Sequence, residues 1–152
     1  MDIDVVNIEL KREYSVQAPN RIATCEDAYK FICQQIGHAT VEKFILICID
    51  YDYRPLCFST IGIGSSDKII IELSEIFKTA LLVNAKHLIV AHNHIGSSLE
   101  PTQSDLDTTK NIGYIGRIMG IELIDSLIVN ATDEYLSIRR YIAKKEKQHE
   151  VG

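Results

Sequence analysis

The spacing of apolar and polar side chains predicts both strands and helices in the first half of the chain. Residues 5–16 alternate between apolar and polar side chains, as a half-buried strand does. A helix is predicted over 24–37, with Thr24 as its N-cap and an acidic first turn. Apolar runs at about 43–51 and 55–62, joined by a turn, predict an antiparallel hairpin.

The second half of the chain continues this alternation. Helices are predicted over 74–84 and about 102–119, a buried strand over 86–91, and closing strands at about 121–129 and 134–138. The side chains expected to pack on the sheet are Ile76, Phe77, Ala80, Leu81 and Leu82 in the first helix and Leu106, Ile112, Ile115, Ile118 and Met119 in the second. This order of elements indicates an α/β fold, a mixed β-sheet flanked by helices.

The composition is that of one ordinary globular domain. The chain has 152 residues, of which 46% are hydrophobic and 24% charged. We expect a single domain over 1–152, with its core at about 6–141 and a basic, polar tail at 142–152. The apolar runs are too short to cross a membrane, and the acidic N-terminus differs from a basic signal peptide. A cytoplasmic protein without a membrane partner is therefore expected.

The charge pattern argues against nucleic acid as a partner of this chain. The formal net charge is −5, which opposes attraction to phosphates. A basic cluster from Arg139 to Lys147 is explained by a solvated run of charges. A zinc-dependent nucleobase deaminase would need His-x-Glu and Pro-Cys-x-x-Cys motifs, and the sequence contains neither.

The segment around His92 and His94 predicts a metal site. Side chains two apart on a strand point to the same face, so both imidazoles can reach one ion from the end of a strand. Asp105, in the first turn of the next helix, can supply a third ligand and leave one corner of a tetrahedral zinc site for water. Thr102-x-x-Asp105 also fits a helix capping box, and capping alone would explain both residues.

The stretch from His92 to Asp105 resembles the His-x-His-Pro-x-Gly and Pro-Ser-x-x-Asp pattern of the JAB/MPN+ (JAMM) metallopeptidase domains, above all the bacterial RadC-type proteins. Other stretches similar to these domains are 44–50, 84–85, 123–125 and 134–137. The resemblance covers roughly residues 6–141. It implies the JAB/MPN fold, a cytidine deaminase-like α-β-α sandwich.

The resemblance also implies a zinc metallopeptidase that hydrolyses amide or isopeptide bonds, with a peptide such as a protein tail as its substrate. It implies His92, His94 and Asp105 as ligands of Zn²⁺, and Thr102 as the hydrogen-bond donor to the oxyanion. The family's general base is a glutamate, and its expected position in this chain is occupied by Ser59. Because a serine hydroxyl is a very weak base, activity is expected to be weakened or lost.

The chain departs from the family pattern at other positions too, with Ile95 for proline, Gly96-Ser97 for Ser-Gly, Thr102 for serine and Ser126 for histidine. Two alternatives to an active enzyme therefore stay open. One is a metal-binding or peptide-binding scaffold without activity. The other is an accessory protein in DNA repair, the role with which RadC-type proteins are often labelled. The oligomeric state also stays open, with a homodimer as one alternative.

Overall fold

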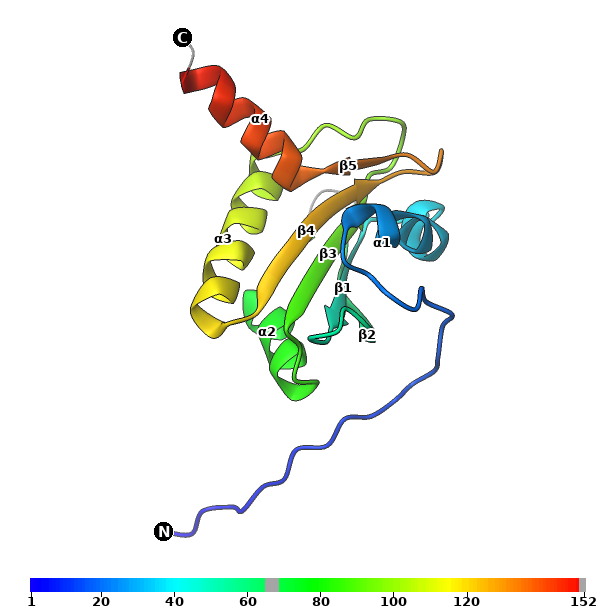
Figure 1. The fold of residues 1–152 in the computed structure, drawn as a ribbon. Helices are drawn as coiled ribbons and strands as arrows, with labels where there is room; N and C mark the ends of the chain where they lie inside the picture. The colour runs from blue at the N-terminus through cyan, green and yellow to red at the C-terminus, as the bar shows by residue number, and fades with distance from the viewer. Residues whose placement is uncertain (65–68, 151–152) are drawn as a thin grey trace.

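The chain folds around one five-stranded mixed sheet (Figure 1). The structure is a computed structural model and describes residues 1–64 and 69–150. The strands are β1 (Lys43–Ile49), β2 (Pro55–Ile63), β3 (His87–Asn93), β4 (Glu122–Val129) and β5 (Tyr135–Ser137). The helices are α1 (Cys25–Ile32), which continues into a π-helical turn (Cys33–Gly37), α2 (Leu73–Leu82), α3 (Gln103–Met119) and α4 (Ile138–Glu150). The α/β class expected from the sequence is confirmed.

The strand order across the sheet is β2-β1-β3-β4-β5. β1 runs antiparallel to both β2 and β3, which confirms the predicted hairpin. β3 and β4 are parallel, because the chain crosses over through α3 before it returns to the sheet, and β5 is antiparallel to β4. β3 therefore lies at the centre of the sheet, with a hydrogen-bonded neighbour on each side.

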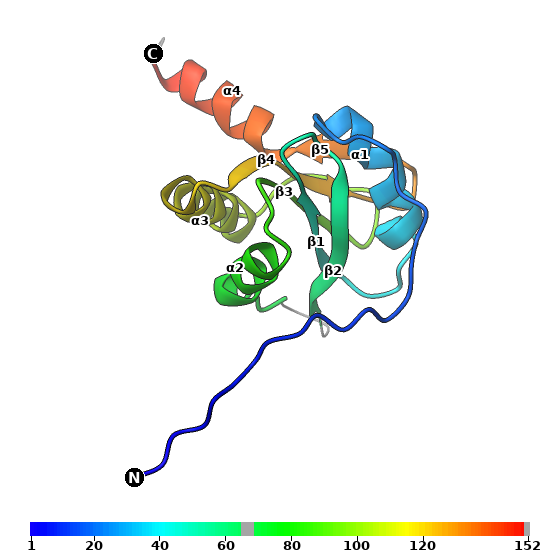
Figure 2. The same cartoon turned by 60° about the horizontal axis from the view of Figure 1, so that its bottom comes forward.

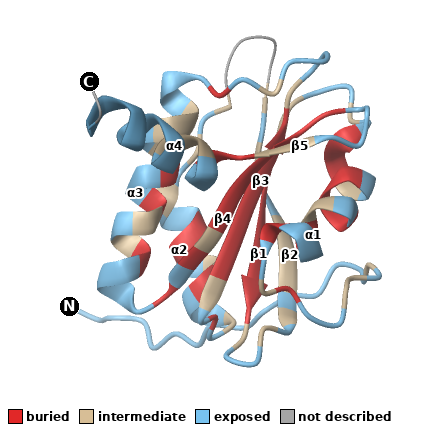
Figure 3. Cartoon of the chain, turned by 45° about the horizontal axis from the view of Figure 1, so that its top comes forward, coloured by how far each residue is buried: buried red, intermediate tan, exposed pale blue. Residues whose placement is uncertain are grey.

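Helices cover both faces of the sheet (Figures 1 and 2). Ile45, Ile47 and Ile49 of β1 pack in one hydrophobic cluster with α1. Phe44 and Leu46 of the same strand point to the opposite face, as the two-residue period of a strand requires, and pack with α2 and α3. The strands at the centre of the sheet are consequently buried over nearly their whole length (Figure 3). The result is an α-β-α sandwich.

The return from α3 to the sheet depends on two glycines. A Cβ atom on the buried Gly116 would collide with the carbonyl oxygen of Ile121, just before β4. With glycine there, the Ile121 N–H donates to the Gly116 carbonyl at 2.8 Å. α3 ends at Gly120, whose φ of 70° is a left-handed conformation that suits glycine.

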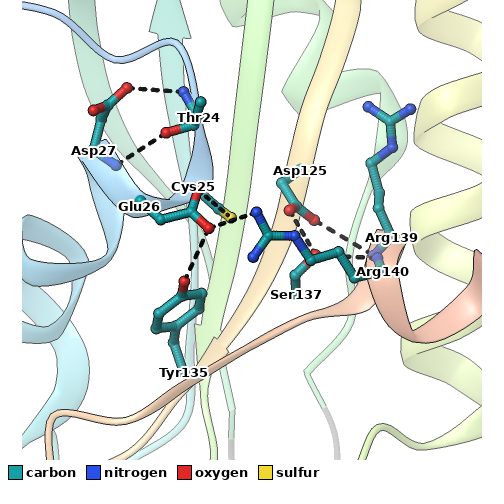
Figure 4. Close-up of polar contacts among 9 residues, drawn as sticks. All are labelled: Thr24, Cys25, Glu26, Asp27, Asp125, Tyr135, Ser137, Arg139 and Arg140. Carbon is teal, nitrogen blue, oxygen red and sulfur yellow. Dashed lines mark hydrogen bonds and ion pairs between the residues drawn. The ribbon is translucent and has the colours of Figure 1, made fainter. Parts of the chain in front are cut away.

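A polar network joins α1, β4 and α4 (Figure 4). The buried Asp125 of β4 accepts a hydrogen bond from the Ser137 hydroxyl at 2.6 Å. The Ser137 oxygen in turn accepts from the backbone N–H of Arg140 at 3.1 Å, which makes Ser137 the cap of α4. The Arg140 guanidinium forms an ion pair with Glu26 of α1. The network thus attaches the last helix to the first.

Most of α4 forms where the sequence predicted only a basic polar tail, at 142–152. Residues 143–150 of this helix are exposed, so no apolar stripe marked them as helical. None of the helices in the described residues is both long and apolar enough to cross a lipid bilayer.

The predicted strand over 5–16 is wrong for the single chain. Residues 1–15, called the N-terminal arm below, are exposed and drawn out away from the body (Figures 1 and 2). A strand needs hydrogen-bond partners on a neighbouring strand, and within the described residues the sheet ends at β2. Val16 and Ala18, at the base of the arm, do pack against the α1 cluster.

Some apolar side chains expected to face the sheet are exposed instead, and they lie in the last turns of α2 and α3: Leu81, Leu82, Ile118 and Met119. The buried face of α3 is formed by Thr109, Ile112 and Gly116. Two of these three residues are polar or small, so the apolar pattern did not identify them. The buried face of α3 is therefore narrower than the sequence predicted.

Candidate metal centre

His92 and His94 lie where the central strand ends. His92 is in register with Phe44 of β1 and with Ile128 of β4, so its backbone is held from both sides. Its imidazole stacks on the Phe44 ring, with centroids 6.0 Å apart and planes inclined by 11°. His94 follows the strand, and its N–H donates to the Val129 carbonyl at 2.9 Å. Both imidazoles are therefore positioned by the sheet.

Asp105 lies in the first turn of α3, where a capping box fixes it. The Thr102 N–H donates to Asp105 Oδ2 at 2.8 Å, and the Asp105 N–H donates to Thr102 Oγ1 at 3.2 Å. The capping alternative left open by the sequence is thus correct. It does not exclude metal binding, because the same carboxylate also faces both histidines.

Three donor groups converge between the end of β3 and the start of α3. His92 Nε2 lies 3.1 Å from His94 Nε2 and 3.2 Å from Asp105 Oδ1. His94 Nε2 lies 3.5 Å from Asp105 Oδ2. Zinc–ligand bonds of about 2.0–2.2 Å give a regular tetrahedron with edges of about 3.3–3.6 Å. The group can therefore hold a metal ion, and its spacing and its nitrogen and oxygen donors suit zinc.

A hydrogen bond at Nδ1 of His94 leaves Nε2 as the nitrogen that faces the site. His94 Nδ1 lies 3.2 Å from the carbonyl oxygen of Ser98, in the loop between β3 and α3. Since a carbonyl only accepts hydrogen bonds, Nδ1 carries a hydrogen, and in the neutral imidazole Nε2 keeps its lone pair for a cation. The loop is itself attached to the sheet, because Asn130 Nδ2 donates to the Ser97 carbonyl at 3.2 Å.

Electrostatics keep the carboxyl group of Asp105 ionised. Burial raises the pKa of Asp105, but hydrogen bonds from His92, His94 and the Thr102 N–H outweigh burial and hold this pKa well below its usual value. The hydrogen bond with Asp105 also raises the pKa of His94, against the opposing effect of burial. A carboxylate that faces two imidazoles in this way favours a positive charge between them.

Ser59, the expected position of the general base, lies in β2. It pairs with Leu46 of β1, which pairs with Val90 of β3. Two strand spacings, or about 10 Å, separate β2 from β3. The structure therefore does not bring Ser59 next to the three ligands, and the role of position 59 stays a prediction.

A carboxylate that the sequence analysis missed lies closer to the histidines. Glu42 directly precedes β1, two residues before Phe44, which pairs with His92 of β3. The negative charge of Glu42 adds to the rise in the pKa of His94, after the larger effect of the Asp105 hydrogen bond.

Backbone contacts hold the segment of Glu42 against the end of β3. The fully buried Asn93 accepts from the Lys43 N–H at 2.7 Å and donates through Nδ2 to the Val41 carbonyl at 3.1 Å. The Gly64 N–H donates to the Glu42 carbonyl at 2.7 Å. In the sequence, the available signal was an acidic residue directly before a buried apolar strand, but only the pairing of β1 with β3 shows its position.

Thr102, the predicted donor to the oxyanion, lies beside the ligands. Its oxygen accepts the Asp105 N–H, so its own O–H can donate to another group. The residue is exposed at the start of α3. Thr102 can therefore cap the helix and donate to a bound molecule at the same time.

Known proteins resemble this chain over most of its length. A family described as the RadC-like JAB domain matches residues 22–145. A UPF0758 protein from Finegoldia magna is 31% identical over 127 residues, which are 84% of this chain and 54% of that protein. A UPF0758 protein from Halalkalibacterium halodurans is 31% identical over 145 residues, which are 93% of this chain and 60% of that protein. A UPF0758 protein from a Geobacillus species is 32% identical over 143 residues, which are 92% of this chain and 60% of that protein. The chain thus spans a little over half the length of these relatives.

Proposed function

Because the chain belongs to the RadC-like JAB domain family, we propose that it is a zinc-dependent hydrolase of amide or isopeptide bonds. The convergence of His92, His94 and Asp105 carries this proposal, since these three residues would hold the metal. When bound, zinc acidifies a water ligand and polarises a carbonyl oxygen. The proposed substrate is a peptide or an isopeptide on a protein tail.

We assign the general base to Glu42 rather than to position 59. Its carboxylate takes a proton from the attacking water as the water oxygen bonds to the carbonyl carbon. The same group returns the proton to the leaving nitrogen when the carbon–nitrogen bond breaks. Its place just before β1, near enough to His94 for its charge to raise the pKa of that imidazole, supports this role.

Thr102 is the proposed donor to the oxyanion. As the carbonyl oxygen gains negative charge, the Thr102 hydroxyl donates a hydrogen bond to it. Asp105, ionised and fixed by the capping box, keeps this hydroxyl and the histidines in one place. With Glu42 as the base, the serine at position 59 no longer implies a loss of activity.

The metal content of the purified chain tests the ligand assignment. Mass spectrometry of the metals should find about one zinc per chain, and His92→Ala and His94→Ala should each abolish zinc binding. His149→Ala is the matched control, because His149 lies in α4, away from β3 and the start of α3. Zinc that stays bound in both site variants would refute the metal centre.

The rate of substrate turnover tests the assignment of Glu42 as the general base. The substrates are a panel of fluorogenic peptides and isopeptides formed on the lysine side-chain amine. Glu42→Gln should lower turnover by about 10²- to 10⁴-fold, the usual worth of a positioned acid–base group, while zinc stays bound. Ser59→Glu should not raise turnover.

Each alternative has its own signature in these measurements. Turnover that survives Glu42→Gln and rises in Ser59→Glu would return the base to position 59. A zinc-bound chain that cleaves no member of the panel would favour the metal-binding scaffold.

A further inference from the structure

The N-terminal arm has the pattern of a strand with one apolar face. From Val6 to Val16 the even-numbered residues are apolar except Arg12, and the odd-numbered residues are polar. The apolar residues at even positions from 6 to 14 are 60–78% exposed, and they are Val6, Ile8, Leu10 and Tyr14. A contiguous exposed apolar surface on a folded chain marks an interaction site. The arm therefore has the sequence of a half-buried strand without the surface that would bury it.

β2 offers the matching surface. It is an edge strand, and among the described residues it is paired on one side only, with β1. The N–H and C=O groups on its other side can therefore pair with an added strand. Leu56 and Ile63 of β2 are 43% and 63% exposed, so an added strand would find apolar side chains beside it.

The length and direction of the arm fit β2 of another chain. β2 has nine residues, and residues 6–14 of the arm supply a strand of equal length. The arm points away from its own sheet in both views of the fold (Figures 1 and 2). The strand that pairs with the free edge of β2 is thus best supplied by the N-terminal arm of a second copy.

We propose that the N-terminal arm of each chain adds a strand to β2 of a second copy, so that two chains exchange arms. Such an exchange is reciprocal and closes a twofold-symmetric dimer. The backbone hydrogen bonds supply affinity, and the alternating apolar side chains select the register. The predicted strand over 5–16 then forms in the dimer. This proposal does not depend on the metal centre.

The mass of the protein in solution tests the exchange. Light scattering after size-exclusion chromatography should find a dimer for the full chain and a monomer after deletion of residues 2–15. Ile8→Asp with Leu10→Asp should also give a monomer. The matched control, Asn7→Asp with Ser15→Asp, adds the same two negative charges to the polar positions and should stay dimeric. Circular dichroism checks that every variant is folded.

Hydrogen exchange identifies the surface that the arm covers. Amides of β2 should exchange more slowly in the full chain than in the chain without residues 2–15, whereas those of β5 should be unaffected. A monomeric full chain, with or without protection of β2, would overturn the proposal. A dimer that survives removal of the arm, or unchanged exchange in β2, would overturn it as well.

Discussion

Asp105 belongs to two structures at once. Its Oδ2 accepts the Thr102 N–H of the capping box, and the two carboxylate oxygens face His92 and His94. Capping fixes the direction of the carboxylate without consuming its capacity to bind a cation, since a carboxylate accepts about four hydrogen bonds or ligands. One side chain thus connects the start of α3 to the end of β3.

Asp105→Asn should separate these two roles. The side-chain oxygen of asparagine can still accept the Thr102 N–H of the capping box, but asparagine is a poor zinc ligand, so zinc should be lost. In the presence of a chelator, Asp105→Ala should unfold more easily than Asp105→Asn, by about 1 kcal/mol, because alanine cannot accept the hydrogen bond of the Thr102 N–H. Metal analysis and urea denaturation measure the two effects. Retention of zinc by Asp105→Asn would exclude Asp105 as a ligand.

The candidate site was predictable in part, for a reason that is visible at this scale. His92, His94 and Asp105 lie close together in the sequence, so strand and helix periods sufficed to place them on one side. Glu42 is distant in the sequence, and its position depends on which strand pairs with which. Periodicity carries no information on that pairing.

At the scale of elements, the same reasoning explains which helices and strands were predicted. β1 and β3 are apolar runs, and they are buried in the fold. α1 has an N-cap residue and an apolar face, and that face is buried. In these elements the apolar pattern of the sequence agrees with the final burial. α4 is polar after its first turns, and contacts with Asp125 and Glu26 support its beginning. Those contacts arise from the tertiary fold and leave no periodic signal in the sequence.

The ion pair between α1 and α4 should make stability depend on pH. The Arg140 hydrogen bond lowers the pKa of Glu26 from 4.5 to about 2. The folded state therefore favours the ionised form. The resulting stabilisation is complete above about pH 4.5 and is lost as the pH falls towards 2.

Glu26→Gln removes this contribution and provides the measurement. At neutral pH the variant should be less stable by at most about 1 kcal/mol, since both side chains are about half exposed. Urea denaturation at a series of pH values should show the difference from wild type shrinking between pH 4.5 and 2. A difference that stays constant over this range would show that the charge of Glu26 is not its source.

At the scale of the whole molecule, the charge distribution bears on whether the chain binds nucleic acid. The net charge is −5, whereas Lys144, Lys145 and Lys147 lie together on the exposed part of α4. Two acidic residues of the same helix, Glu146 and Glu150, lie among or beside them. This mixture is that of a solvated helix rather than a phosphate-binding surface.

The chain should therefore have no tight affinity for duplex DNA at physiological salt. Fluorescence anisotropy with a labelled duplex measures this affinity at several salt concentrations. Deletion of residues 143–152 should leave the melting temperature nearly unchanged, because residues 143–150 are exposed. Tight, steeply salt-dependent binding that this deletion abolishes would instead support a role in DNA repair.

The bridge from Asn93 to Val41 and Lys43 leads us to expect an order in which the site is completed during folding. The three ligands can gather a cation once β3, the loop and the start of α3 have formed, and these are close in the chain. Asn93 reaches residues 50 and 52 positions away, so Glu42 arrives only when β1 has paired with β3. On this assignment, a partly folded chain can hold metal but cannot cleave its neighbours.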